Sequence, residues 1–173
     1  KSGKYNLVWI PMWDHIRGWG LKNWSKISKQ VRVVAFSHNV SELAKKNGLS
    51  TLRVKYYPPS NYKDRTDWKE GNVLFYWNRI GMIGKEDLEK LCSVLNVGTL
   101  FFQKQLDPGL LKRLDYQLPE RLADTRVITL TKYMPRVLYE KALIQANIYL
   151  APRRSEGVGL SFIEALSRGC FVM

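Results

Sequence analysis

The second half of the chain alternates short apolar runs with segments of helical character, and this alternation restricts the fold more than any other feature. In one such segment Leu88, Leu91, Cys92 and Leu95 recur at the spacing of a single helix face. Repeated strand–helix units predict a doubly wound parallel sheet, with ligands bound at the carboxyl ends of its strands. The expected strands are 73–77, 99–103, 126–131, 148–150 and 171–172, and the expected helices are 85–95, 109–118, 135–146 and one from about 160 to Gly169.

Residues 5–57 predict a second, smaller unit of the same kind. A strand over 5–13, ending at Asp14–His15, is followed by a strand over 31–36 and one over 51–57. A helix over 40–47, capped by Ser37 or Asn39 and closed by Gly48, connects the last two. A strand, a helix and a strand at this spacing form a parallel crossover.

A change in composition separates these two parts. Pro58 and Pro59 open a mostly polar stretch that reaches Gly71, which is typical of an interdomain linker. The expected organisation is therefore a domain over 1–57, a linker over 58–71 and a domain over 72–173. The chain starts at Lys1 and stops inside an apparent strand, so we expect a piece of a longer protein with both α/β domains incomplete.

The stretch 147–173 carries the clearest chemical signal. Gly157 and Gly159 allow backbone amides to approach a ligand just before a helix, whose first turn offers free N–H groups to an anion. Glu156 and Glu164 stand with seven residues between them. An ionised carboxylate only accepts hydrogen bonds, and a sugar diol offers two donors. Amides for a diphosphate and carboxylates for hydroxyls together describe a site for a sugar nucleotide.

This stretch resembles the E-x7-E signature of the retaining GT-B glycosyltransferases, the large group that includes family four. The sequence from Glu156 to Ala165, EGVGLSFIEA, differs from the usual pattern by Val158 at the aromatic position. The resemblance implies that Glu156 meets the hydroxyls of the donor sugar and that Glu164 meets the ribose. It also implies that the amides of Gly157, Val158, Gly159 and Leu160 contact the donor.

A second stretch, 78–85, follows the first strand of the larger domain and resembles the "GR…KG" segment at the same place in that family. There an Arg and a Lys bind the donor diphosphate, which implies this role for Arg79 and Lys85. Asn78 stands where the family usually has Gly, and Glu86 follows the Lys where Gly is frequent. The segment 133–152 also resembles the family's lead-in to the glutamates.

The resemblance implies two Rossmann-like GT-B domains that close over the donor near Pro58–Pro59. The implied reaction is transfer of a sugar, of the hexosyltransferase type, from a nucleotide sugar to a glycan, lipid or small-molecule acceptor with retention of configuration. No Asp-x-Asp element occurs, so no metal or other cofactor is expected. In the family a strand ending in His–Asp lies near the donor sugar, which makes His15, beside Glu156, the second catalytic candidate despite the reversed order Asp14–His15.

Several alternatives stay open. Ser161 and Glu164 also fit a helix capping box, in which Glu164 satisfies backbone donors. A GT-B sugar-nucleotide epimerase is a related alternative. A net charge of +13 also suits a basic module that binds an anionic membrane or nucleic acid. Such a module would interleave aromatics with lysines on an exposed face. Its candidate residues are Trp13, Trp19, Lys22, Trp24, Lys26 and Lys29.

Composition further restricts the class of protein and its location in the cell. The hydrophobic content of 45 % excludes a disordered polymer, and nucleic acid is not inferred from charge alone. The sequence has no apolar run of about 18 residues and no secretory signal. Cys92 and Cys170 lie in apolar surroundings and are expected to be buried thiols. These features favour a cytoplasmic protein, with peripheral contact to an anionic membrane as a further expectation.

Overall fold

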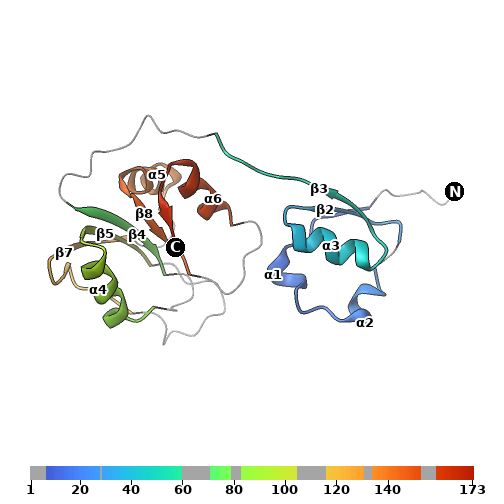
Figure 1. Ribbon diagram of the computed structural model, residues 1–173, viewed down its shortest axis with the longest axis horizontal. Helices are drawn as coiled ribbons and strands as arrows, with labels where there is room; N and C mark the ends of the chain where they lie inside the picture. The colour runs from blue at the N-terminus through green and yellow to red at the C-terminus, as the bar shows by residue number, and fades with distance from the viewer. Residues whose placement is uncertain are drawn as a thin grey trace. The chain divides into compact units, whose positions relative to one another are not determined.

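The computed structural model describes residues 7–27, 29–59, 71–78, 83–104, 116–130, 134–152 and 159–173 (Figure 1). The chain divides into two compact units: residues 1–57 make up most of the first, and most of residues 58–173 belong to the second. Each unit contains helices and a sheet of wholly or mainly parallel strands, so the chain is a mixed α/β protein, as the alternation of strands and helices predicted.

The first unit is built on a parallel sheet with the strand order β1-β2-β3. The strands are β1 (Val8–Trp9), β2 (Arg32–Ala35) and β3 (Ser50–Arg53), and α3 (His38–Lys46) connects the last two. Ser37 is the N-cap of α3, because its Oγ accepts a hydrogen bond of 3.2 Å from the Val40 backbone N–H. Of the two predicted caps, Ser37 and Asn39, the structure therefore has Ser37.

The beginning of this unit differs from the prediction. The strand expected over 5–13 is limited, in the described residues, to Val8–Trp9, and two short helices follow it: α1 (Trp13–Ile16) and α2 (Leu21–Trp24). Asp14 and His15 therefore lie in α1 and not at the end of a strand. Of the predicted run, only Trp13 lies in a helix, and the residues that pack inward from the helices are Ile16 of α1 and Trp24 of α2. The buried cluster contains Ile16, Trp24, Val33, Ala35, Val40, Ala44 and Leu49.

The second unit contains a larger sheet with the strand order β6-β7-β5-β4-β8-β9. All of its neighbouring strands are parallel except β6 and β7, which are antiparallel. Its strands are β4 (Asn72–Trp77), β5 (Val97–Gln103), β6 (Arg121–Leu122), β7 (Thr125–Leu130), β8 (Ile148–Leu150) and β9 (Phe171–Val172). Its helices are α4 (Lys85–Val94), α5 (Arg136–Gln145) and α6 (Leu160–Ser167).

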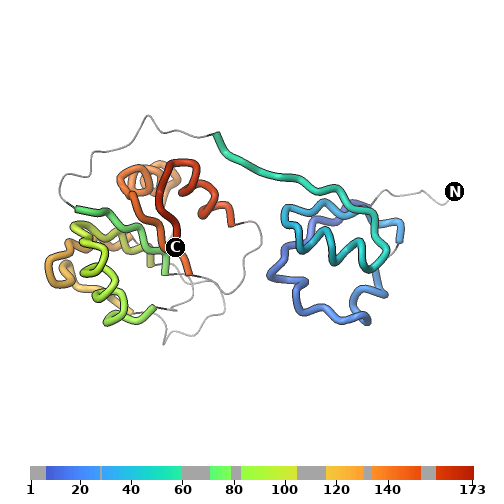
Figure 2. Tube along the Cα trace, viewed as in Figure 1, coloured from blue at the N-terminus to red at the C-terminus, as the bar shows by residue number. Residues whose placement is uncertain are grey.

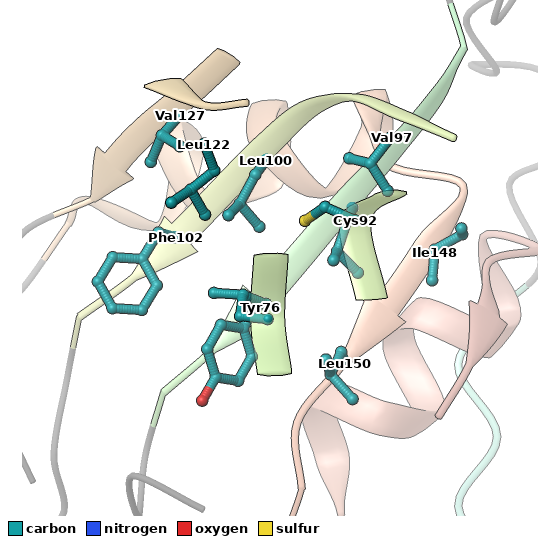
Figure 3. Packing of buried hydrophobic residues seen from close by; sticks show 11 residues of the cluster. Tyr76, Cys92, Val97, Leu100, Phe102, Leu122, Val127, Ile148 and Leu150 are labelled. Atoms are coloured by element: carbon teal, nitrogen blue, oxygen red, sulfur yellow. The ribbon is translucent and has the colours of Figure 1, made fainter. Parts of the chain in front are cut away.

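Helices cover both faces of this sheet (Figure 1). Leu88 and Cys92 of α4 pack on one face, while Leu143 of α5 and Ala165 of α6 pack on the other. The central strands are apolar on both sides, because successive side chains of a strand point to opposite faces. Figure 3 shows the α4 face, where Tyr76, Leu100, Phe102 and Leu150 belong to one buried cluster.

Two details of this unit depart from the sequence analysis. The short antiparallel strand β6 was not predicted, so the sheet is not wholly parallel. It pairs with β7 across a tight turn in which Ala123 has φ of 48°. The helix expected over 109–118 falls mostly outside the described residues, but 116–118, at its end, are not helical.

Candidate functional site

Successive strands of the second unit are added first on one side of β4 and then on its other side, so the strand order has a switch point between β4 and β8. From β4 the chain runs through α4 to β5 and then β7 on one side, and afterwards returns through α5 to β8 on the other (Figure 2). In open α/β sheets the crevice at such a switch point, outside the carboxyl ends of the strands, is where ligands bind. Tyr76 and Leu150, near those ends, are direct partners in the β4–β8 pairing.

The two segments that the sequence singled out leave the sheet at this point. The segment 78–85 follows β4, and the segment 151–164 follows β8. They are about seventy residues apart in the chain, and parallel pairing of β4 with β8 brings their starting points side by side. Arg79, Glu156, Gly157 and Val158 lie outside the described residues, whereas Lys85, Gly159, Leu160 and Glu164 lie within them.

The first of these segments begins at a buried polar residue, Asn78. Only 1 % of Asn78 is exposed; its backbone N–H donates to the Gln103 carbonyl at 3.0 Å. The Tyr76 hydroxyl donates to Asn78 Oδ1 at 3.2 Å. Further along, the Tyr116 hydroxyl donates to the Ile83 carbonyl at 2.9 Å, so hydrogen bonds hold the chain on both sides of 79–82. In the sequence Asn78 stood out only because the resembling family usually has Gly there. Its position directly after an apolar strand is the signal that could have predicted its burial.

Burial keeps the two tyrosines of this network protonated. It raises the pKa of Tyr76, and contact with Tyr116 adds to the shift. Burial likewise raises the pKa of Tyr116, whose ring stacks on Phe102 with 5.5 Å between the centroids. Both hydroxyls therefore remain donors at neutral pH, and their hydrogen bonds tie this edge of the sheet to Asn78 and Ile83.

Lys85 is the first residue of α4 and is exposed. Gly84 is the N-cap, with extended backbone and no side-chain hydrogen bond to the helix. The amino end of α4 therefore combines a cation with backbone N–H groups, an arrangement that attracts anions. Glu86 and Asp87 in the same first turn oppose this attraction. Lys85 could therefore contact a phosphate, but the negative charges of Glu86 and Asp87 weaken the positive potential around it.

The second segment reaches α6 through Gly159, which has φ of 67°. This left-handed conformation favours glycine, and it directs the chain into a helix that starts at Leu160. Because α6 starts there, Ser161 is inside the helix and is not its N-cap. The capping box that the sequence left open for Ser161 and Glu164 is therefore not formed.

Glu164 instead pairs with Arg136, the first residue of α5. Arg136 Nη2 donates to Glu164 Oε1 at 2.9 Å, and Arg136 Nε donates to Glu140 Oε1 at 2.6 Å. The Glu164 side chain is 17 % exposed, against 35 % for Glu140 and 63 % for Arg136. Glu164 is thus the shielded member of the three, and a shielded carboxylate requires a partner. Sequence reasoning did not find Arg136, because its only local signal is the i, i+4 spacing to Glu140.

Arg136 and Glu140 favour each other's charged forms. The hydrogen bonds that Arg136 donates to Glu140 and Glu164 raise the pKa of Arg136, and Arg136 lowers the pKa of Glu140. Aromatic rings lie close by: Tyr139 packs edge-on against Phe75 with 5.6 Å between centroids. Burial raises the pKa of Tyr139, and Tyr149 and Glu164 raise it further. The carboxylate of Glu164 therefore stands at the border of an apolar layer.

Two sequence candidates lie in the first unit. His15 is exposed on α1. Of the tryptophans proposed for a binding face, Trp19 and Trp24 pack on each other and on Trp9, with ring centroids 5.5 to 5.9 Å apart. Trp13 packs against the same buried cluster. Trp24 is 4 % exposed, and Lys22 and Lys26 are exposed. Lys29 is exposed as well, but its ammonium donates to the Asn47 backbone carbonyl. These tryptophans therefore pack into the core of the first unit, and the lysines lie around them at its surface.

In the part of the chain that the structure describes, no three His, Cys, Asp or Glu side chains gather in a group that could hold a metal ion. No helix there is both long enough and apolar enough to cross a membrane. Comparisons with models of protein families, with curated proteins and with solved structures found no significant match.

Proposed function

We propose that this chain is part of a retaining GT-B glycosyltransferase, with the nucleotide-sugar donor bound by the second unit. The observation that supports this most is the pairing of β4 with β8, which brings the starts of segments 78–85 and 151–164 together at the switch point of the sheet. One segment offers cations for a diphosphate. The other offers a glycine-bearing turn into a helix and two carboxylates for hydroxyls.

In this proposal Glu164 accepts hydrogen bonds from the ribose, and Glu156 accepts them from the donor sugar. Arg79, Lys85 and the amides of residues 157–160 face the diphosphate. As the sugar leaves, negative charge grows on the diphosphate, and donors fixed in advance stabilise that charge without reorganising. Neither glutamate attacks the sugar: Glu156 positions the donor sugar, and Glu164 positions the ribose.

The proposed acceptor is a saccharide or a lipid, and His15 stays the second catalytic candidate. The proposed reaction needs no metal ion, because cations and amides neutralise the leaving group. The proposed setting is the cytoplasm, with peripheral contact to an anionic membrane through exposed lysines.

Calorimetric titration of the chain with UDP, GDP and ADP, with and without magnesium, tests this proposal. We expect one nucleotide to bind more tightly than the others, with no dependence on magnesium. The Glu164→Ala variant should bind that nucleotide more weakly while its melting temperature stays close to that of the wild type. A folded chain that binds none of the three nucleotides would contradict the proposal.

A further inference from the structure

The contact between Arg136 and Glu164 joins two helices that are separate in the chain. Arg136 opens α5, which follows the carboxyl end of β7, and Glu164 lies one turn into α6, which follows the carboxyl end of β8. Both helices pack on the same face of the sheet, through Leu143 and Ala165. The pair therefore stands at the edge of the sheet where the ligand site is proposed.

The geometry of the contact leaves part of Glu164 available. Arg136 donates to Oε1 at 2.9 Å, and among the described residues no side chain or backbone donor bonds Oε2. A carboxylate has lone pairs for about four hydrogen bonds, so one donor on Oε1 leaves most of its accepting capacity unused. A guanidinium on one oxygen also restricts rotation of the group, which directs the second oxygen away from Arg136.

Arg136 is itself held in place. Its Nε donates to Glu140 one turn further along α5, so two N–H groups of one planar fork are engaged by two carboxylates. The two carboxylates share a single cation, and the fork fixes its orientation more firmly than a lysine ammonium would. Neither contact is needed to build the core, because the Arg136 side chain is 63 % exposed.

We propose that Arg136 is a positioning residue for nucleotide binding: it orients the carboxylate of Glu164 so that Oε2 meets the ribose hydroxyls. This inference rests on the proposed function, because it assigns Glu164 to the ribose. Arg136 itself touches neither the ribose nor the reacting atoms. Its contribution appears in how strongly the site distinguishes a ribose from a sugar that lacks its hydroxyls.

The test compares binding of the preferred nucleoside diphosphate with binding of its 2′,3′-dideoxy analogue. The quantity measured is the ratio of the two dissociation constants, in wild type, Arg136→Gln, Arg136→Lys and Lys141→Gln. Lys141 is exposed on the same helix, and its replacement removes the same charge. A loss of long-range attraction would weaken both ligands equally in either Gln variant, whereas loss of positioning affects only the ligand with hydroxyls.

We expect Arg136→Gln to lower the preference for the ribose by about tenfold, the usual effect of one charged hydrogen bond. Arg136→Lys should restore part of it, and Lys141→Gln should leave it unchanged. If the ratio of the two dissociation constants in Arg136→Gln equals that of wild type, whatever the affinity for each ligand, the inference is wrong and the proposed function stands. If wild-type protein binds no nucleotide, both fail together.

Discussion

Asn147 donates its side-chain amide to Oδ1 of Asn72 at 2.7 Å, and this contact joins the amino ends of β8 and β4. Asn147 Oδ1 also accepts from the Val73 backbone N–H at 2.8 Å. Asn72 in turn donates to the Leu95 carbonyl at the end of α4. One side chain thus sets the register of the two strands whose opposite ends meet at the candidate site.

Replacing Asn147 with Ala should lower the free energy of unfolding by about 1–3 kcal/mol, because it leaves the Val73 N–H and the Asn72 amide oxygen without their partner. Urea denaturation followed by circular dichroism measures the change. Gln145→Ala, in the exposed last turn of α5, is the control and should change stability by less than about 0.5 kcal/mol. Equal effects of the two replacements would contradict this role for Asn147.

The cap of α3 supplies a second stability test. Ser37→Ala removes the oxygen that accepts from the Val40 N–H, and should destabilise the first unit by about 1 kcal/mol. Asn39→Ala is the matched control, because Asn39 was the other cap that the sequence allowed and lies inside the helix, where its side chain is exposed. Thermal melts of both variants distinguish them. A larger loss for Asn39→Ala would overturn the assignment of the cap.

Cys92 provides a test by pH. Burial raises the pKa of the Cys92 thiol to about 11, and Figure 3 shows the side chain within the apolar cluster under α4. An unfolded cysteine ionises near pH 8.5, so the stability that the buried thiol contributes is complete below that pH. It is lost as the pH rises toward about 11, because only the unfolded chain gains by losing the proton.

We therefore expect the free energy of unfolding to fall by about 1.5 kcal/mol more between pH 8 and pH 10 in wild type than in Cys92→Ala. Comparison of the two slopes cancels the tyrosines, which are common to both proteins. Below about pH 8, where the thiol is protonated in both states, the alanine variant is less stable because it leaves a cavity. Identical slopes in the two proteins would show that Cys92 ionises normally in the folded state.

Lys85 should contribute to nucleotide binding through the phosphates and not through the base or the sugar. Lys85→Ala is expected to weaken binding of a nucleoside diphosphate by roughly three- to tenfold, since an exposed lysine contributes less than a buried one. Its effect on the nucleoside without phosphate should be negligible. Lys90→Ala, on the same helix and also exposed, is the control. An equal loss for nucleoside and nucleoside diphosphate would contradict the assignment.

The sequence predicted the second unit better than the first, because its apolar strands and periodic helices are longer and therefore easier to recognise. Strands such as Asn72–Trp77 are apolar on both faces and are bounded by helices with clear periodicity, so local pattern and tertiary burial favour the same structure. The apolar, aromatic run over 5–13 suited a strand locally, but α1 begins at Trp13, and Ile16 of that helix packs into the buried cluster with α3 and the sheet. The residues β6 uses, Arg121 and Leu122, carry no strand pattern at all.

The sequence by itself was enough to predict the α/β class, Ser37 as one of two possible caps of α3, and a glycine at the end of α6. It also singled out Glu156 and Glu164 as candidate site residues. These follow from local spacing and backbone preference, which a linear pattern records. Only the tertiary structure decided that β4 and β8 are neighbours, that Asn78 is buried at their edge and that Arg136 bonds Glu164 in place of a capping box. Each of these depends on which strands pair across the sheet, and pairing joins residues that are far apart in the chain.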